Sequence, residues 1–137
     1  MFDAAGAERA IIITEGVLMY LPAATVDGLA AESARHPGVV HWISDITTSG
    51  FNNAIRGGEQ STSGLDHVRA PDALDGEQIL NILGTHGWAT ASMRSYVRDA
   101  AFTQDRVRRV FGERSASAAP PAFPPDDPTG IHRFSRA

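Results

Sequence analysis

Two carboxylates stand at the ends of apolar stretches, where their charge could serve a site. Glu15 follows the β-branched run Ile11–Ile13 after a single residue, and Asp45 lies near the end of the apolar segment Val39–Ile46. A carboxylate at the end of a buried strand is unfavourable unless a cation or hydrogen-bond donors meet it. Both residues are therefore candidates for contacting a charged or polar ligand.

Structural roles would account for the same residues. Glu15 would then pair with Arg9 or cap a helix, Asp45 would form a turn, and Tyr20 would be a core ring with its hydroxyl at the surface. Metal chemistry is not indicated, because the five histidines lack the spacing of metal ligands. The serines lack the G-x-S-x-G pattern of serine hydrolases.

The elements that would position the two carboxylates form a strand–helix–strand unit. The unbroken run Ile11–Ile13 predicts a strand covered on both faces, as in a parallel sheet. A weakly amphipathic helix is predicted from about Pro22 to the stop at His36–Gly38. Val39–Ile46 predicts the second strand. This spacing is typical of a right-handed crossover between parallel strands.

The rest of the chain alternates polar segments with further elements. The polar, glycine-rich segment 47–71 is interpreted as a lid or flexible loop with room for a short helical turn, and 115–128 as a proline-rich connector. Asp75 predicts a helix N-cap, with Gln78 completing a capping box. The remaining expected elements are a strand from Trp88 to Tyr96, a helix from Asp99 to Phe111 and a short terminal strand, either an edge strand or an antiparallel one, over residues 131–136.

Composition excludes several classes of function. The chain has 137 residues, enough for one domain with a core, and a net charge of −4 that gives no reason to expect a nucleic-acid or membrane partner. All its basic residues are arginine and it has no cysteine, which excludes lysine Schiff bases, thiolate nucleophiles and cysteine-bound zinc. No apolar run approaches the length of a membrane span, and the acidic N-terminus does not look like a secretory signal. A cytoplasmic location is expected.

Three segments together resemble a known family. T-E-G-V-L-M-Y-L-P, at Thr14–Pro22, W-I-S-D-I, at Trp42–Ile46, and H-G-W-x-x-x-x-x-R-S, at His86–Ser95, are similar to the second half of a class I S-adenosylmethionine-dependent methyltransferase. The branch is the leucine carboxyl methyltransferase-like group, with its E-G-[LV]-L-x-Y-L signature. The resemblance covers about Glu8 to Arg109.

The resemblance implies a Rossmann-like, doubly wound α/β sheet of parallel strands with an antiparallel terminal strand, in which ligands bind beyond the carboxyl ends of the strands. Glu15 would reach the cationic amino-acid moiety of S-adenosylmethionine, and Gly16 would let the backbone pass close to that cofactor. Tyr20 would face the substrate. Asp45, at the end of the next strand, is a further candidate for binding the substrate.

One departure from the family pattern shapes the expected domain. The glycine-rich cofactor loop of the family's first strand and the ribose-binding acid of its second are not found in the sequence. The whole chain, 1–137, is therefore interpreted as one partial domain, the C-terminal half of the methyltransferase fold. Half a sheet exposes a parallel edge beside Ile11–Ile13, and either an N-terminal half or a second copy of the chain is expected to cover it.

Two functions follow as hypotheses. The first is transfer of a methyl group from S-adenosylmethionine to a carboxylate or hydroxyl of a small molecule, with the catalytic residues unassigned. The enzyme's main task in such a transfer is to hold the nucleophile and the methyl group in line. The second is a non-catalytic methyltransferase remnant that acts as a dimerising or interaction module.

Overall fold

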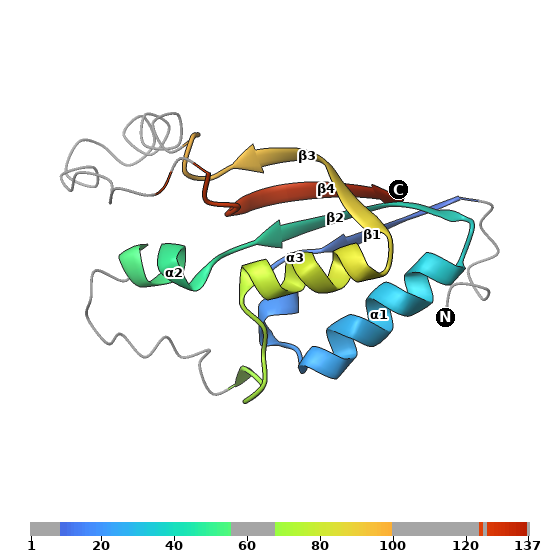
Figure 1. The fold of residues 1–137 in the computed structure, drawn as a ribbon, viewed down its shortest axis with the longest axis horizontal. Helices are drawn as coiled ribbons and strands as arrows, with labels where there is room; N and C mark the ends of the chain where they lie inside the picture. Colours follow the sequence, from blue (N-terminus) through green and yellow to red (C-terminus); the bar gives the residue numbers. More distant parts are fainter. Residues whose placement is uncertain (1–8, 56–67, 100–123, 125, 137) are drawn as a thin grey trace.

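The computed structural model describes residues 9–55, 68–99, 124 and 126–136. Within these ranges four strands form one open sheet in the order β1-β2-β4-β3 (Figure 1). The strands are β1 (Ala10–Thr14), β2 (Val39–Ile46), β3 (Trp88–Ser95) and β4 (Gly130–Arg136). The molecule is thus a mixed α/β protein in this part of the chain.

Strand directions confirm part of the predicted topology. β1 pairs with β2 in parallel, as the crossover spacing predicted, and the helix that lies between them in the sequence connects the two strands. β4 is antiparallel to both β2 and β3, so β1, β2 and β3 all run in the same direction. The terminal strand is therefore antiparallel, as expected, but the alternative of an edge strand is wrong. β4 lies inside the sheet because its two edges pair with β2 and β3.

Two helices cover one face of this sheet: α1 (Ala23–Arg35) and α3 (Gly76–Thr85) (Figure 1). α3 begins at the predicted capping box, in which the Asp75 side chain accepts from the first-turn backbone and Gln78 Oε1 accepts from the Asp75 amide at 2.8 Å. It ends before Gly87, whose φ of 81° favours glycine. The helices are joined by a 2.7 Å contact between His86 Nε2 and Asp27 Oδ1.

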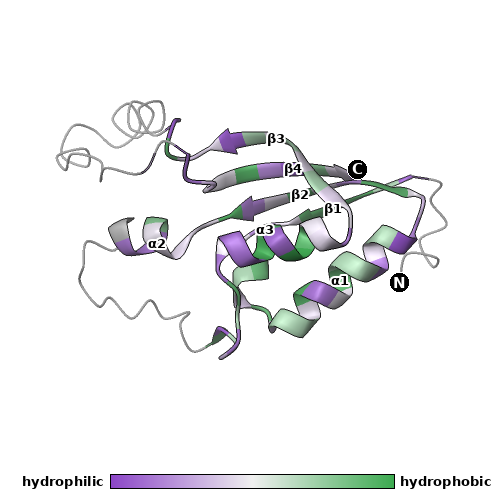
Figure 2. Ribbon diagram, in the orientation of Figure 1, coloured by the Kyte–Doolittle hydropathy of each residue, from purple (hydrophilic) through white to green (hydrophobic). Residues whose placement is uncertain are grey.

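The core lies between these helices and the sheet. Trp42 and Trp88 are fully buried and meet edge to face with ring centroids 6.0 Å apart. Their indole nitrogens donate to Thr14 Oγ1 at 2.9 Å and to Ser33 Oγ at 3.2 Å, so neither buried donor lacks a partner. Figure 2 shows hydrophobic residues recurring along the strands and along α1 and α3. The remaining buried apolar residues of the described ranges are Leu18, Val26, Ala30, Val39, Ile46, Leu74, Ile79, Leu83 and Phe134.

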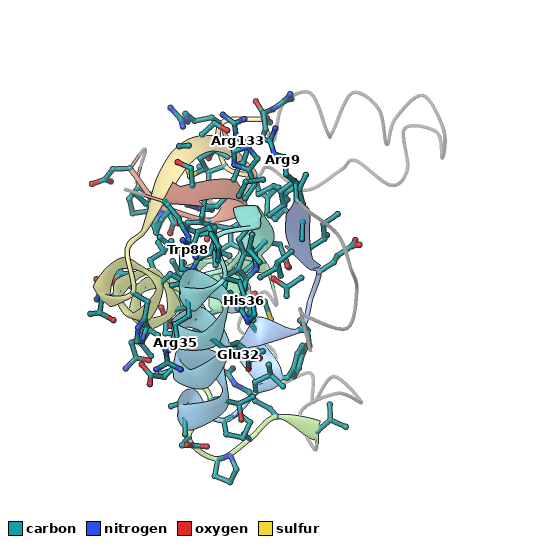
Figure 3. The ribbon with its side chains drawn as sticks, turned by 90° about the vertical axis from the view of Figure 1, so that its right-hand side faces the viewer. Arg9, Glu32, Arg35, His36, Trp88 and Arg133 are labelled. Carbon is teal, nitrogen blue, oxygen red and sulfur yellow. The ribbon has the colours of Figure 1, made fainter. Side chains whose placement is uncertain are left out.

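The opposite face of the sheet corrects one prediction. Ile11 and Ile13 of β1 are 54% and 69% exposed, so the expectation that this strand is covered on both faces is wrong for the described chain. The reason is topological, since α1 and α3 both pack on the face that carries Ile12. Figure 3 shows Arg9 and Arg133 on the side of the sheet away from α1. We call the side that carries Ile11 and Ile13 the open face.

The polar segments are described only in part. Within 47–71 the structure contains α2 (Ser49–Ile55), a short helix where a helical turn was anticipated, and residues 56–67 lie outside the described ranges. Residues 100–111 of the predicted Asp99–Phe111 helix and most of the 115–128 connector also lie outside them. None of the helices in the described ranges is long and apolar enough to cross a membrane.

Candidate functional site

The carboxyl ends of β1, β2 and β3 lie at the same end of the sheet. We call this end the carboxyl edge; it is distinct from the side of β1 that has no partner strand among the described residues. Glu15 follows the end of β1 by one residue, Asp45 is the penultimate residue of β2, and Tyr96 directly follows β3. Because these strands run in the same direction, the three residues lie at the same edge. This is where ligands bind in open α/β sheets.

A hydrogen bond ties two of the predicted residues together. The Gly16 amide donates to Asp45 Oδ1 at 2.7 Å, so the turn after Glu15 is held against the end of β2. Gly16 has a φ of 58°, in the left-handed region that favours glycine, while a Cβ built there would meet no atom within 4 Å. Glycine is required here by backbone conformation and not by crowding. Asp45 thus positions the turn, and its contact with substrate remains a prediction.

Glu15 is exposed at the carboxyl edge. Arg9, the partner considered from the sequence, precedes the amino end of β1, roughly 20 Å away at about 3.3 Å per residue. Within the described residues, Glu15 forms no ion pair with Arg9 or with another arginine. Its carboxylate is therefore available to a cation that arrives from solution.

Tyr96 is the residue of this edge that sequence reasoning missed. Partial burial raises the pKa of its phenol, and the negative charges of Asp45 and Glu15 raise it further. Its ring also packs against Phe51 of α2, with centroids 6.2 Å apart. The signal in the sequence was its position as the last residue of the predicted strand from Trp88 to Tyr96. Tyr96 is a neutral hydrogen-bond donor beside two carboxylates at neutral pH.

Tyr20 does not join this group. It is half-buried at the end of the short 3₁₀ helix η2 (Leu18–Tyr20), and its carbonyl accepts from the Ala70 amide at 3.0 Å. No described contact links its ring to Glu15 or Asp45. Its assignment to the substrate remains a prediction.

Two cavities lined by described residues lie beyond the end of β2. The larger, of about 330 Å³, is lined by Thr48, Ser49, Gly50, Asp75, Glu77, Gln78 and Asp127. The smaller, of about 70 Å³, is lined by Met19, Thr47, Ser49, Asn52, Asn53, Arg69, Leu74 and Asp75. Neither is lined by Glu15, Asp45 or Tyr20. The cavities and the predicted site residues are therefore distinct features of this end of the molecule.

Asp75 links the loop after β2 to the start of α3. Its carboxylate accepts from the Ser49 amide at 2.7 Å, from the Ser49 hydroxyl and from the Glu77 amide at 3.0 Å. Burial alone would raise the pKa of Asp75, but these hydrogen bonds and the charge of Arg69 outweigh it and lower the pKa. On the other wall, Asp127 Oδ2 accepts from the Thr48 hydroxyl at 3.1 Å. Both carboxylates are thus engaged in holding the loop.

The described residues contain no group of three or more His, Asp or Glu side chains placed to hold a metal ion. Comparisons with protein-family models, with curated proteins and with solved structures found no match. The chemistry that the arrangement offers is an exposed carboxylate, a carboxylate that anchors a glycine turn and a protonated phenol. Such a set suits a ligand that carries a positive charge and a hydrogen-bond acceptor.

Proposed function

We propose that this chain is part of a class I S-adenosylmethionine-dependent methyltransferase and carries the subsite for the cofactor's amino-acid moiety. The observation behind the proposal is the exposed carboxylate of Glu15 at the carboxyl edge, next to a glycine turn anchored by Asp45. The ammonium group of S-adenosylmethionine would pair with Glu15. Gly16 would present backbone without a side chain to the same cofactor.

The sheet supports this proposal at the level of strand direction. The resemblance implied parallel strands followed by an antiparallel terminal strand. β1, β2 and β3 run in one direction and β4, the last strand in the sequence, runs against them. A Rossmann-like sheet in which this chain forms the C-terminal half is the finer proposal.

The residues of the carboxyl edge have separate tasks in the proposed reaction. S-adenosylmethionine supplies an activated methyl group, and the protein holds an acceptor oxygen of a small molecule in line with it. Tyr96 keeps its proton at neutral pH, so it would donate a hydrogen bond and not act as a base. Tyr20 and the loop after β2 would contact the acceptor. The reaction is proposed to take place in the cytoplasm.

A second candidate function is favoured by the position of the cavities. Neither of the two cavities described above is lined by Glu15 or Asp45, and β1 exposes one edge and one face in the described chain. Both features suit a non-catalytic methyltransferase remnant that acts as an interaction module. Such a module would bind a protein partner without binding the cofactor.

Calorimetry with S-adenosylhomocysteine separates the two functions. We expect the wild-type chain to bind, and Glu15→Gln to weaken binding by about tenfold or more, the effect of losing one ion pair of about 1.4 kcal/mol. Glu32→Gln, the same change at an exposed glutamate of α1, controls for the loss of one negative charge elsewhere on the molecule. Equal affinity in the wild type and Glu15→Gln would contradict the role of Glu15. No binding by the wild type would favour the interaction module.

A further inference from the structure

We propose that β1 pairs with β1 of a second copy of this chain across a two-fold axis, giving one continuous sheet. The proposal concerns an interaction surface and does not depend on the proposed enzymatic function. β1 is the edge strand of the sheet, and one of its sides has no partner strand among the described residues. Neither a charge nor a proline interrupts Ala10–Thr14, although these are the usual devices that protect a sheet edge.

The backbone fixes which residues offer hydrogen bonds at this edge. The Ala10 amide donates to Gly38 at 2.7 Å, toward β2. The β1–β2 pairing has a register irregularity between Ala10 and Ile11. Exposure nevertheless alternates along β1 from Ala10 to Thr14, so the backbone groups of Ile12 and Thr14 also point toward β2, and the amides and carbonyls of Ile11 and Ile13 point outward. Two copies related by a two-fold axis meet in antiparallel fashion. Hydrogen-bonded pairs must then join outward residues, which restricts the register to a few choices.

Charge complementarity selects one of these registers. When Ile12 lies opposite Ile12 of the second copy, Ile11 lies opposite Ile13 and can exchange two backbone hydrogen bonds with it, twice in the dimer. The same register sets Arg9 opposite Glu15 at both ends of the paired segment. Shifting the register by two residues loses these two opposite-charge pairs. The segment R-A-I-I-I-T-E is therefore complementary to itself when read in reverse.

The side chains agree with this arrangement. Ile11 and Ile13, 54% and 69% exposed, lie on the open face. Cross-strand pairing would place Ile11 of one copy against Ile13 of the other copy. A single strand pair buries less surface than a standard interface of about 1,600 Å², so we expect a weak dimer. Glu15 serves both this pairing and the proposed cofactor contact. The size measurements below are therefore made without cofactor, and the two proposals fail separately.

Sedimentation velocity of the full chain between about 1 µM and 1 mM, where weak interfaces associate, tests the pairing. We expect dimer to form as concentration rises, with Ile13→Lys weakening it about tenfold or more. Ile131→Lys is the matched control, since Ile131 is also exposed (43%) on the open face but belongs to the internal strand β4. A monomer throughout, or equal loss in both variants, would overturn the proposal.

Charge exchange tests the register independently of strand stability. We expect Arg9→Glu and Glu15→Arg each to weaken the dimer and the double variant to restore it, because the exchange recreates both opposite-charge pairs. Circular dichroism checks that these surface variants stay folded. Hydrogen exchange should show the Ile11 and Ile13 amides gaining protection with concentration. A double variant that dimerises as weakly as the single variants would overturn the proposed pairing. Exchange rates of the Ile11 and Ile13 amides that do not change with protein concentration would overturn it too.

Discussion

The Gly16 amide lies 2.7 Å from Asp45 Oδ1, and this bond joins the residue after Glu15 to the end of the neighbouring strand. Glu15 itself has no such anchor in the described chain, so its position depends on the turn that Asp45 holds. Gly16 also adopts a backbone conformation that other residues rarely take. The candidate site is thus organised by a carboxylate that need not touch a ligand.

Removal of the Asp45 carboxylate should loosen this turn. We expect Asp45→Ala to lower the free energy of unfolding by about 1–2 kcal/mol, the effect of losing a charge-assisted hydrogen bond. Asp45→Asn keeps an oxygen acceptor and should lose less. Urea denaturation measures both. Identical stability in Asp45→Ala and the wild type would show that the bond contributes nothing.

Tyr96 reports whether Glu15 and Asp45 act together. Burial and the two carboxylates raise the pKa of Tyr96 above 10.0, so its neutral form is favoured in the fold. Since the folded pKa is the higher one, the stability it contributes is present below about pH 10 and lost as pH rises through the folded value. In a Tyr20→Phe background, which leaves one tyrosine, Glu15→Gln and Asp45→Asn should each lower the pKa of Tyr96. Ultraviolet titration of tyrosinate measures it, and an unchanged pKa in Glu15→Gln would place Glu15 too far away to act.

Arg136 should stabilise the junction between α1 and β4. Its guanidinium Nη2 donates to the carbonyls of Ser33, Ala34 and His36 at the end of α1 and its Cζ lies 5.7 Å from the Trp88 ring centroid. We expect Arg136→Ala to cost about 1–3 kcal/mol, because helix carbonyls lose a cationic donor and Trp88 loses a cation–π contact.

Arg133→Ala is the matched control for Arg136→Ala, since Arg133 lies on the same strand and is exposed on the other face. We expect it to change stability by no more than about 0.5 kcal/mol. Thermal or urea unfolding compares the two. Similar losses in both variants would mean that the contacts of Arg136 with α1 are not the source of its effect.

Asp75 should make stability depend on pH in the acid range. Burial opposes ionisation, but the hydrogen bonds from Ser49 and Glu77 lower the pKa below the usual 3.8. A lowered folded pKa means that the contribution of Asp75 is complete above about pH 3.8 and is lost as pH falls through the folded value. We expect Asp75→Asn to be less stable near neutral pH and to lose less on acidification. Parallel pH profiles for the two proteins would contradict this assignment.

His132 should have the opposite character, a base kept neutral by the fold. Burial lowers its pKa, although Pro128, whose carbonyl lies 2.7 Å from Nε2, partly opposes the shift. Below about pH 6.5 the unfolded chain therefore binds more protons at His132 than the folded chain does. The free energy of unfolding falls as the pH drops through this range. Proton NMR of the imidazole measures the pKa directly. A value at or above 6.5 would show that burial does not dominate.

Local sequence signals predicted several of the described elements well. The bounds of β2 follow its branched and aromatic residues, and the start of α3 follows Asp75 and Gln78, whose two reciprocal hydrogen bonds form the capping box. Gly87 ends α3 because it adopts a positive φ. Each of these outcomes depends on neighbours within a few residues, which is the range in which sequence patterns carry information.

The arrangement of the elements in space was harder to predict from the sequence than the elements themselves. The run Ile11–Ile13 looks the same whether one or two faces of its strand are covered, because composition does not tell what packs on each side. The place of β4 between β2 and β3 depends on pairing between segments far apart in the sequence. Tyr96 acquires its role only because three strand ends meet. Glu15 and Gly16 were found from a local motif, and their ligand remains a proposal.

The position of β4 also has a consequence for how the protein is made. β2 and β3 do not touch along their edges, because β4, which follows both of them in the sequence, lies between them. During synthesis β2, α3 and β3 leave the ribosome before residues 130–136 do, so for that time the nascent chain has the β1–β2 pair and a separate β3 without its partner strand. β4 then joins them into one sheet. The unpaired edges of β2 and β3 are exposed in that interval, which is when a chaperone that recognises strand edges would bind the chain.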